Sequence, residues 1–223
     1  MLRSMVTTRA PLLLILLLAA STATFAADPD PLQDLCVADL NNTIKVNGFV
    51  CKPAAAVTAE DFAFKGLAKP AVINNTLGAV VTVGNVEKIP GLNTLGVSLA
   101  RIDYAPGGLN PPHTHPRATE TVFVLYGALD VGFITTANKL INKTIVVGET
   151  FVFPRGLVHF QKNNGEKPAA VISGFNSQLP GTQPIAAALF SASPPVPDNV
   201  LAKAFQISTK EVEKIKSRFA PKS

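Results

Sequence analysis

The sequence predicts an all-β domain, a barrel or a sandwich, that follows a loop-rich arm and is itself followed by α-helices. Between residues 80 and 176, short runs rich in Val, Ile, Phe and Thr alternate with Gly, Pro or Asn, which is typical of many short strands. The segment before residue 80 is rich in turn-forming residues and has little periodicity. After Pro197 the apolar residues change to the spacing of helices.

Residues 1–26 have the features of a secretory signal peptide. Arg3 and Arg9 precede an apolar stretch, Leu12–Ala20, and small residues follow around Ala26. This stretch is roughly half as long as a membrane-crossing helix, and the sequence contains no longer one. We therefore expect a secreted protein without a membrane span.

The charge of the chain argues against nucleic acid as a partner. The formal net charge is +5, from 20 basic and 15 acidic residues. Removal of the signal peptide takes away two arginines and no acid, so the mature charge is about +3. The roughly 195 residues that remain are enough for one domain with a buried core.

Residues 27–79 form the predicted N-terminal arm, which contains the two cysteines of the chain, Cys36 and Cys51. In an exported protein these should form a disulfide rather than remain two buried thiols, and a loop of this length stabilises the fold by about 3 kcal/mol. Both thiols are then unavailable as nucleophiles. Asn-x-Thr sequons predict N-glycosylation at three positions, Asn41, Asn74 and Asn142. Among these, Asn74 is the preferred site.

Residues 80–190 form the predicted barrel. The runs read as strands are 80–83, 94–104, 121–126, 129–135, 143–147, 150–153, 158–162 and 169–175. Some runs, such as Val122–Leu125, are apolar at consecutive positions, so both of their faces should be covered. One face should meet the barrel interior, and the other a second sheet or a neighbouring subunit.

Residues 191–223 form the predicted helical segment. Asp198 should cap one helix that extends through Phe205, and Ser208 or Thr209 should cap another that extends through Phe219. Apolar residues at helical spacing should pack against a partner or the body of the protein: Val212, Ile215 and Phe219. The lysines and arginines of this segment are interleaved with Glu211 and Glu213, which favours a solvated helix face over an interaction patch.

The three histidines of the chain lie in two short segments. His113 and His115 are two residues apart, so on a strand both imidazoles point to the same face. Pro116–Thr119 can bend the chain and bring Glu120 beside them, and His159 lies on a later predicted strand. Because every histidine falls in these segments beside a carboxylate, the pattern predicts a metal site rather than isolated core or surface histidines.

Three neutral imidazoles and one carboxylate suit a borderline divalent ion. In octahedral geometry they leave two positions for water, an oxygen species or a small ligand. The donor set alone is compatible with Mn, Fe, Co, Ni, Cu and Zn. The sequence contains no GxSxG, Walker, GxGxxG or CxxC pattern that would supply another catalytic chemistry.

These two segments match both motifs of the cupin superfamily, and the mature chain resembles plant germin-like proteins. The first motif is Gly107-x5-His113-x-His115-x4-Glu120-x6-Gly127, and the second is Gly148-x5-Pro154-x-Gly156-x2-His159-x3-Asn163. The resemblance extends to residues 28–34, the cysteine pair, residues 91–96 and the Pro-rich C-terminal segment. It implies a jelly-roll cupin β-barrel and one manganese ion per chain on His113, His115, Glu120 and His159. It also implies a hexamer, a trimer of dimers joined through the C-terminal helices, in the apoplast or cell wall.

The resemblance leaves several activities open. In this family, oxalate oxidases present two asparagines to the substrate, of which Asn110 matches one, whereas Ala100 occupies the position of the other. We therefore expect superoxide dismutation in defence or stress response, and rank oxalate oxidation last. The alternative is a non-enzymatic protein of the wall that binds ligands or partners and whose metal mainly stabilises the barrel.

Overall fold

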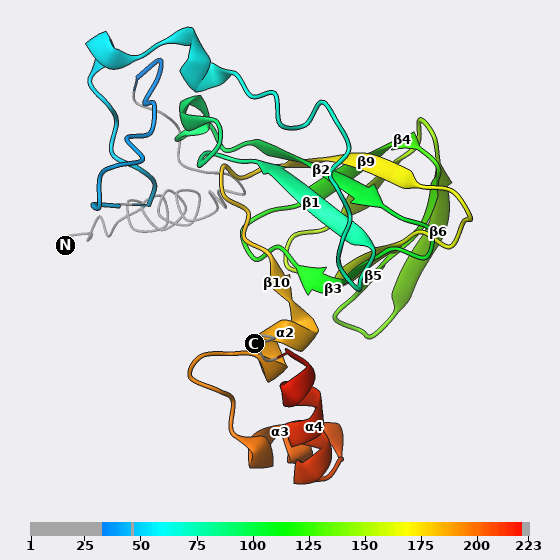
Figure 1. Cartoon of the computed structure of the whole chain (residues 1–223). Coiled ribbons are helices and arrows are strands. Elements are labelled where there is room, and N and C mark those ends of the chain that lie inside the picture. The colour runs from blue at the N-terminus through cyan, green and yellow to red at the C-terminus, as the bar shows by residue number, and fades with distance from the viewer. Residues whose placement is uncertain (1–32, 46, 220–223) are drawn as a thin grey trace, which may run out of the picture.

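The computed structural model describes residues 33–45 and 47–219, and the predicted signal peptide lies outside them. Two antiparallel sheets face each other, with the strand orders β1-β2-β9-β4-β7 and β10-β3-β8-β5-β6 (Figure 1). In the first sheet the strands are β1 Ala79–Gly84, β2 Ser98–Tyr104, β4 Glu120–Tyr126, β7 Thr150–Phe153 and β9 Ala169–Phe175. In the second they are β3 Leu109–Thr114, β5 Ala128–Ile134, β6 Leu140–Val146, β8 His159–Lys162 and β10 Gln183–Pro184. The predicted all-β fold is confirmed.

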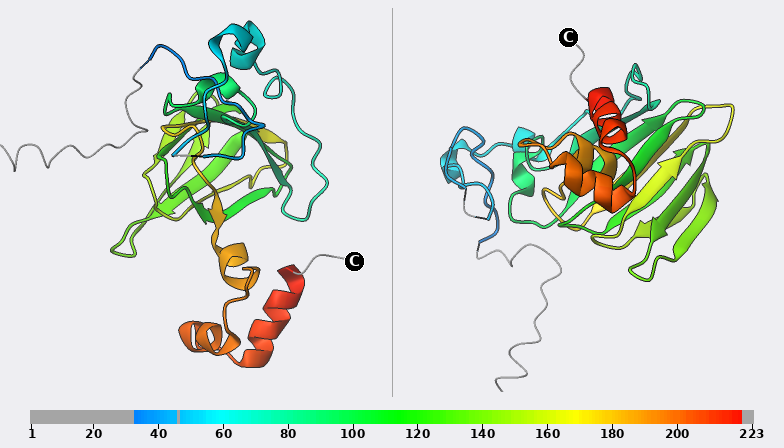
Figure 2. Two further views of the ribbon diagram at one scale, coloured as in Figure 1. Left: turned by 90° about the vertical axis from the view of Figure 1, so that its left-hand side faces the viewer. Right: turned by 90° about the horizontal axis from the view of Figure 1, so that it is seen from below.

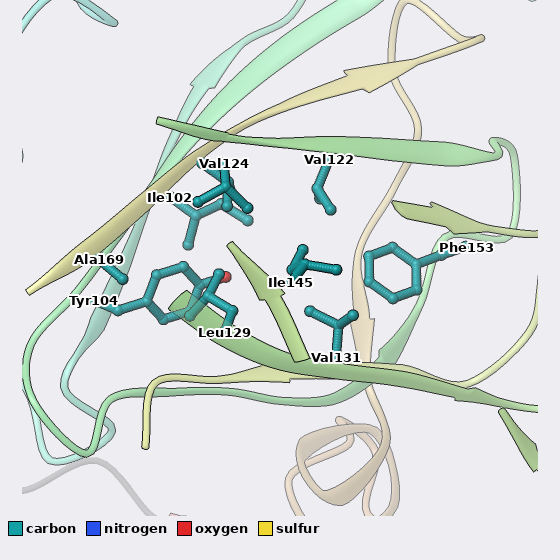
Figure 3. Close-up of a cluster of buried hydrophobic side chains, with 10 residues drawn as sticks. Ile102, Tyr104, Val122, Val124, Leu129, Val131, Ile145, Phe153 and Ala169 are labelled. Carbon is teal, nitrogen blue, oxygen red and sulfur yellow. The ribbon is translucent and has the colours of Figure 1, made fainter. Parts of the chain in front are cut away.

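The core lies between the two sheets (Figure 3). Alternate residues of each strand point inward, so Val122 and Val124 of β4 are fully buried while Phe123 between them is 43% exposed. The inward residues come from both sheets and are Ile102, Tyr104, Val122, Val124, Leu129, Val131, Ile145, Phe153, Ala169 and Val171. Burial of this set is the main stabilising contribution to the barrel.

The outer face of the first sheet is apolar and partly uncovered. Leu99, Phe123 and Val152 each expose more than two fifths of their surface. The prediction that both faces of β4 are covered therefore does not hold within one chain. The sequence-based alternative, that a neighbouring subunit covers this face, stays a prediction.

Strand β3 was not among the predicted runs. Its sequence contains Pro111 and Pro112, which have no N–H to donate and normally argue against a sheet interior. The pairing of β3 with β8 shifts register between Asn110 and His113, across the two prolines. The irregularity accommodates the missing donors and lets His113 pair directly with His159.

Strand β2 begins four positions later than predicted. The 3-10 helix η3 occupies Pro90–Leu92, and the backbone then turns at Thr94, whose φ is 67°, and at Gly96, also at 67°. A positive φ is incompatible with a strand, so residues 94–97 form a turn instead.

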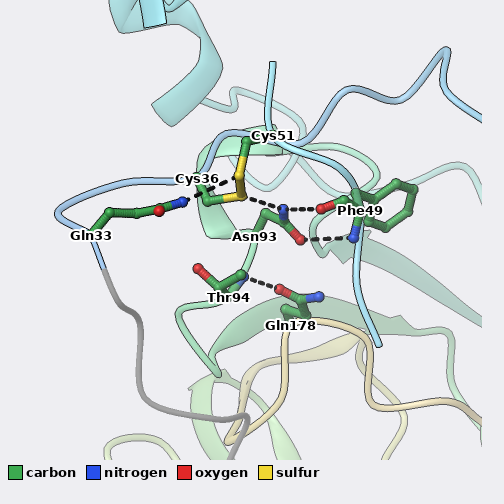
Figure 4. The surroundings of a disulfide bond; sticks show 7 residues. All are labelled: Gln33, Cys36, Phe49, Cys51, Asn93, Thr94 and Gln178. Atoms are coloured by element: carbon green, nitrogen blue, oxygen red, sulfur yellow. Dashed lines mark hydrogen bonds between the residues drawn. A yellow bond between two sulfur atoms is a disulfide. The ribbon is translucent and has the colours of Figure 1, made fainter. Parts of the chain in front are cut away.

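The disulfide between Cys36 and Cys51 is present as predicted, with the two Cα atoms 4.8 Å apart. Asn93 fixes this loop to the barrel: its Nδ2 donates to the Phe49 carbonyl (2.8 Å) and its Oδ1 accepts from the Phe49 amide (3.2 Å) (Figure 4). The arm continues through the short 3-10 helices η1 Ala54–Ala56 and η2 Ala59–Phe62.

Three helices follow the barrel, α2 Ile185–Phe190, α3 Asp198–Phe205 and α4 Thr209–Phe219. The last two were predicted and α2 was not. They stand off the barrel as a small layer joined to it through β10 (Figures 1 and 2). Leu201 and Val212 are buried within this layer, so Val212 finds its partner in its own chain. Among the described residues, no helix has the length and apolar character needed to cross a membrane.

Candidate metal centre

The four predicted ligands come from three strands that meet at one end of the barrel. His113 lies in β3, and His115 follows directly after that strand. Glu120 begins β4 in the facing sheet, and His159 begins β8 beside β3. The turn at residues 116–119 joins β3 to β4 and carries the chain from one sheet to the other. Two sheets therefore contribute ligands to one point.

The donor atoms of these side chains converge. One ligand atom from each residue lies within 4.8 Å of all the others, and all four residues are buried. Glu120 Oε2 lies 3.1 Å from His115 Nε2 and 3.0 Å from His159 Nε2. The fold thus brings together all four residues that the sequence predicted as ligands.

Backbone carbonyls fix the orientation and tautomer of each imidazole. The Nδ1 atoms of His113 and His159 each lie 2.8 Å from the carbonyl oxygen two residues earlier, at Pro111 and Leu157. His115 Nδ1 likewise contacts a backbone carbonyl, that of Gly181, which is 66 positions away in the sequence. Because a carbonyl can only accept, each Nδ1 must donate the proton, and the Nε2 lone pairs are left for a metal ion.

The protonation equilibria fit this arrangement. Burial lowers the pKa of His113 from 6.5 to about 4, and the adjacent His159 acts in the same direction. Burial alone would raise the pKa of Glu120, but positive charge on the His115 and His159 side of its carboxylate outweighs burial and holds that pKa below its ordinary value. A neutral His113 and an ionised Glu120 are the forms that bind a metal.

The contact between the carboxylate and the imidazoles requires a cation. With Nδ1 protonated, each Nε2 of a neutral imidazole directs a lone pair at a negatively charged oxygen, which is repulsive at 3.0 Å. Only a proton or a metal ion between the atoms makes the contact favourable. Three imidazoles and a carboxylate provide a suitable set for a divalent transition metal, so the residues fit the predicted ion.

A cavity of about 300 Å³ gives access to the cluster. His113, His115 and Glu120 contribute to its wall, and most of the remaining wall is apolar. The apolar residues come from β1, β2, β9 and the segment after β9, and include Val81, Val83, Ile102, Phe175 and Leu179. A small molecule can therefore reach the ligands through a largely apolar cavity.

Asn110 and Ala100 both line this cavity. The carboxamide of Asn110 offers donors, whereas the methyl group of Ala100, which is 2% exposed, offers none. The three sequons lie elsewhere, and Asn41, Asn74 and Asn142 are all exposed on the surface.

Sequence reasoning missed the residue that supports Glu120. Ser173 Oγ donates to Glu120 Oε1 at 2.7 Å and is fully buried. The sequence does contain a hint of this role, because Ser173 is a polar residue inside the apolar run 169–175. Its partner lies 53 positions away and could not be identified without the pairing of β4 with β9.

The chain is similar to known proteins over most of its length. Residues 65–213 match the sequence profile of the Cupin family. Germin-like protein 5-1 of Oryza sativa subsp. japonica is 73% identical over 213 residues, 96% of this chain and 94% of that protein. The rhicadhesin receptor of Pisum sativum is 74% identical over 193 residues, 86% and 89% of the two chains. A structure of recombinant oxalate oxidase in complex with glycolate superposes with a TM-score of 0.85 at 46% sequence identity. The superposition covers 87% of this chain and 98% of the oxalate oxidase chain.

Proposed function

Because this chain belongs to the germin-like proteins of the cupin family, we propose that it is a secreted manganese protein that dismutates superoxide. The observation that carries the proposal is the buried cluster of three imidazoles and one carboxylate at the wall of an open cavity. Such a set leaves coordination positions free for a small ligand.

The residues of the chain have defined parts in this function. His113, His115, Glu120 and His159 would hold the ion, and the carbonyls behind the imidazoles keep Nε2 directed inward. When bound, manganese supplies one-electron redox chemistry, so one superoxide is oxidised to dioxygen and a second, with two protons, is reduced to hydrogen peroxide. The apolar wall limits water near the ligands and strengthens electrostatic interactions there.

The cavity supports superoxide better than oxalate as a substrate. The oxalate oxidase structure that resembles this chain contains glycolate, a small hydroxy acid. Oxalate has four acceptor oxygens and two charges, which fixed donors must meet. Asn110 supplies donors here and Ala100 supplies none. A missing hydrogen bond to a charged group costs about 1.5 to 3 kcal/mol, roughly one to two orders of magnitude in binding. Superoxide is too small to need both amides.

Secretion to the apoplast or cell wall follows from the N-terminal signal and is supported by the disulfide, which persists in oxidising compartments. Glycosylation belongs to the same proposal. Asn74 is the preferred site, because it is exposed and lies directly before the polar turn at residues 75–77. At Asn142 the sequon lies within β6, and the Thr144 hydroxyl donates to Asp130.

Assembly into a homo-oligomer, a hexamer built as a trimer of dimers, is also part of the proposal. The apolar outer face at Leu99, Phe123 and Val152 supports one contact. The exposed Val200 and Phe205 of α3 and Phe219 of α4 support another. Burial of such side chains drives association.

A second function, non-enzymatic binding in the cell wall, has one observation in its favour. A relative that is 74% identical is named a receptor, the rhicadhesin receptor. In that case the metal would mainly stabilise the barrel, and the oligomer would present binding surfaces to a partner.

The test is a pair of assays on one manganese-loaded sample. We expect superoxide dismutation that disappears with the metal, and no peroxide release from oxalate. Ala100→Asn is the matched variant, and it should leave dismutation in place while providing the missing amide donor. Robust oxalate oxidation by the wild type would refute the substrate assignment. Full manganese with neither activity would favour the binding function.

A further inference from the structure

Arg117 is the one cationic side chain among the described residues that line the metal cavity. It is two positions after the ligand His115, on the turn that joins β3 to β4. Its Nε donates to the Leu179 carbonyl at 2.7 Å, and its backbone amide donates to the Pro180 carbonyl. The guanidinium is thereby held against the segment 179–182, which forms part of the cavity wall.

The approach of Arg117 to this segment is close. A methyl group built on Gly181 would lie 2.8 Å from Arg117 Nη2, so the absence of a side chain at Gly181 leaves room for the guanidinium. The Gly181 carbonyl accepts from His115 Nδ1. The same short segment therefore orients a metal ligand and holds Arg117 beside it.

The positive charge of Arg117 has no carboxylate partner among the described residues. The nearby Glu120 is instead engaged with His115, His159 and Ser173. Arg101, by contrast, is buried and paired with Asp103 at 2.9 Å. Arg117 is exposed, and neither of its terminal nitrogens donates a hydrogen bond among the described residues. An exposed guanidinium in a cavity wall favours anions there.

We propose that Arg117 makes the mouth of the metal cavity a binding site for small monovalent anions and guides them to the metal. A positive charge beside an apolar cavity raises the local concentration of anions and their rate of entry. The guidance of superoxide rests on the proposed function, whereas the anion site itself does not require turnover.

The test compares four manganese-loaded proteins: wild type, Arg117→Gln, Arg117→Lys and Lys167→Gln. Lys167 is exposed in the β8–β9 turn, at the other end of β8 from His159, so its loss is a matched change of net charge. Azide is the probe, because it is a monovalent anion that binds metals without turnover. Its dissociation constant is measured spectroscopically, alongside metal content and the salt dependence of dismutation.

We expect Arg117→Gln to weaken azide binding and to slow dismutation at low ionic strength by about three- to tenfold, with unchanged metal content. The difference should shrink above about 0.15 M salt, where surface charges are screened. Arg117→Lys should restore most of the loss because it keeps the charge, and Lys167→Gln should match the wild type.

Two results would overturn the anion site: an Arg117→Gln protein with wild-type azide affinity, or a loss that Arg117→Lys fails to restore. The second would mean that Arg117 acts by holding residues 179–182. A wild type that binds azide with the expected dependence on Arg117 but does not dismutate superoxide would refute the proposed function and retain the anion site.

Discussion

At the scale of single residues, the metal centre depends on side chains that never contact the ion. Ser173 donates to the oxygen of Glu120 that faces away from the imidazoles, and so fixes the carboxylate. We predict that Ser173→Ala keeps all four ligands but weakens manganese binding by about tenfold, because the carboxylate loses its orienting donor. Competition with a metal chelator of known affinity measures the change.

The matched control is Ser217→Ala, which removes an exposed hydroxyl from α4, away from the barrel. It should bind manganese as the wild type does. Equal affinity in Ser173→Ala and the wild type would show that Glu120 holds its position without the serine.

The ligands themselves could be predicted from sequence because the chain has only three histidines. Each of its three histidines is a ligand candidate, and their spacing places two of them on one face of the chain. The supporting groups could not be predicted in the same way. Ser173 and the carbonyls of Pro111, Leu157 and Gly181 act through pairings that only the folded chain creates.

At the scale of elements, the disulfide loop is tied to the barrel by Asn93. Its side chain is fully buried and satisfies both the amide and the carbonyl of Phe49. We predict that Asn93→Ala lowers the free energy of unfolding by about 2 to 4 kcal/mol, because both backbone groups lose a buried partner. Urea unfolding with the disulfide intact measures the loss.

Asn199→Ala serves as the comparison, since Asn199 is exposed in α3 and its side chain forms no hydrogen bond among the described residues. Its effect should stay within about 0.5 kcal/mol. If the two variants were equally stable, the hydrogen bonds of Asn93 would contribute little, and other contacts, such as the Ala38 amide donating to the Pro90 carbonyl, would hold the loop.

The elements that sequence reasoning identified are those with strong local patterns. Strands β7 and β9 have the predicted bounds, because Gly148 and Pro154 flank β7 and Pro168 precedes β9. Helix α3 ends at Phe205 as predicted, but Asp198 is its first residue and not its cap, since Pro197 occupies the N-cap position without a side-chain hydrogen bond. Strand β3 was missed since Pro111 and Pro112 argue against a strand, and only the bulged pairing with β8 accommodates them. Helix α2 was missed because its sequence, Ile185–Phe190, is a short apolar run without a polar cap.

At the scale of the whole molecule, the helical layer is expected to join subunits. Although Val212 is buried in its own chain, Val200, Phe205 and Phe219 remain substantially exposed. We predict that truncation after Pro197 reduces the assembly mass, because it removes both α3 and α4. Light scattering coupled to size exclusion measures that mass.

Metal content is the control in this experiment, since the truncated protein retains the entire barrel. A truncated protein that keeps the full assembly mass would show that these helices pack only within their own subunit. The outer face at Leu99, Phe123 and Val152 would then be the main contact between chains.

The central claim is that His113, His115, Glu120 and His159 together hold one manganese ion. Elemental analysis of the protein secreted by a plant host, wild type beside His159→Ala, tests it most directly. His159 is the single ligand from β8, so its removal opens one side of the site. We predict about one manganese per wild-type chain and loss of most of it in the variant. Unchanged metal content in His159→Ala, or a wild type that carries another metal at full occupancy, would contradict the account.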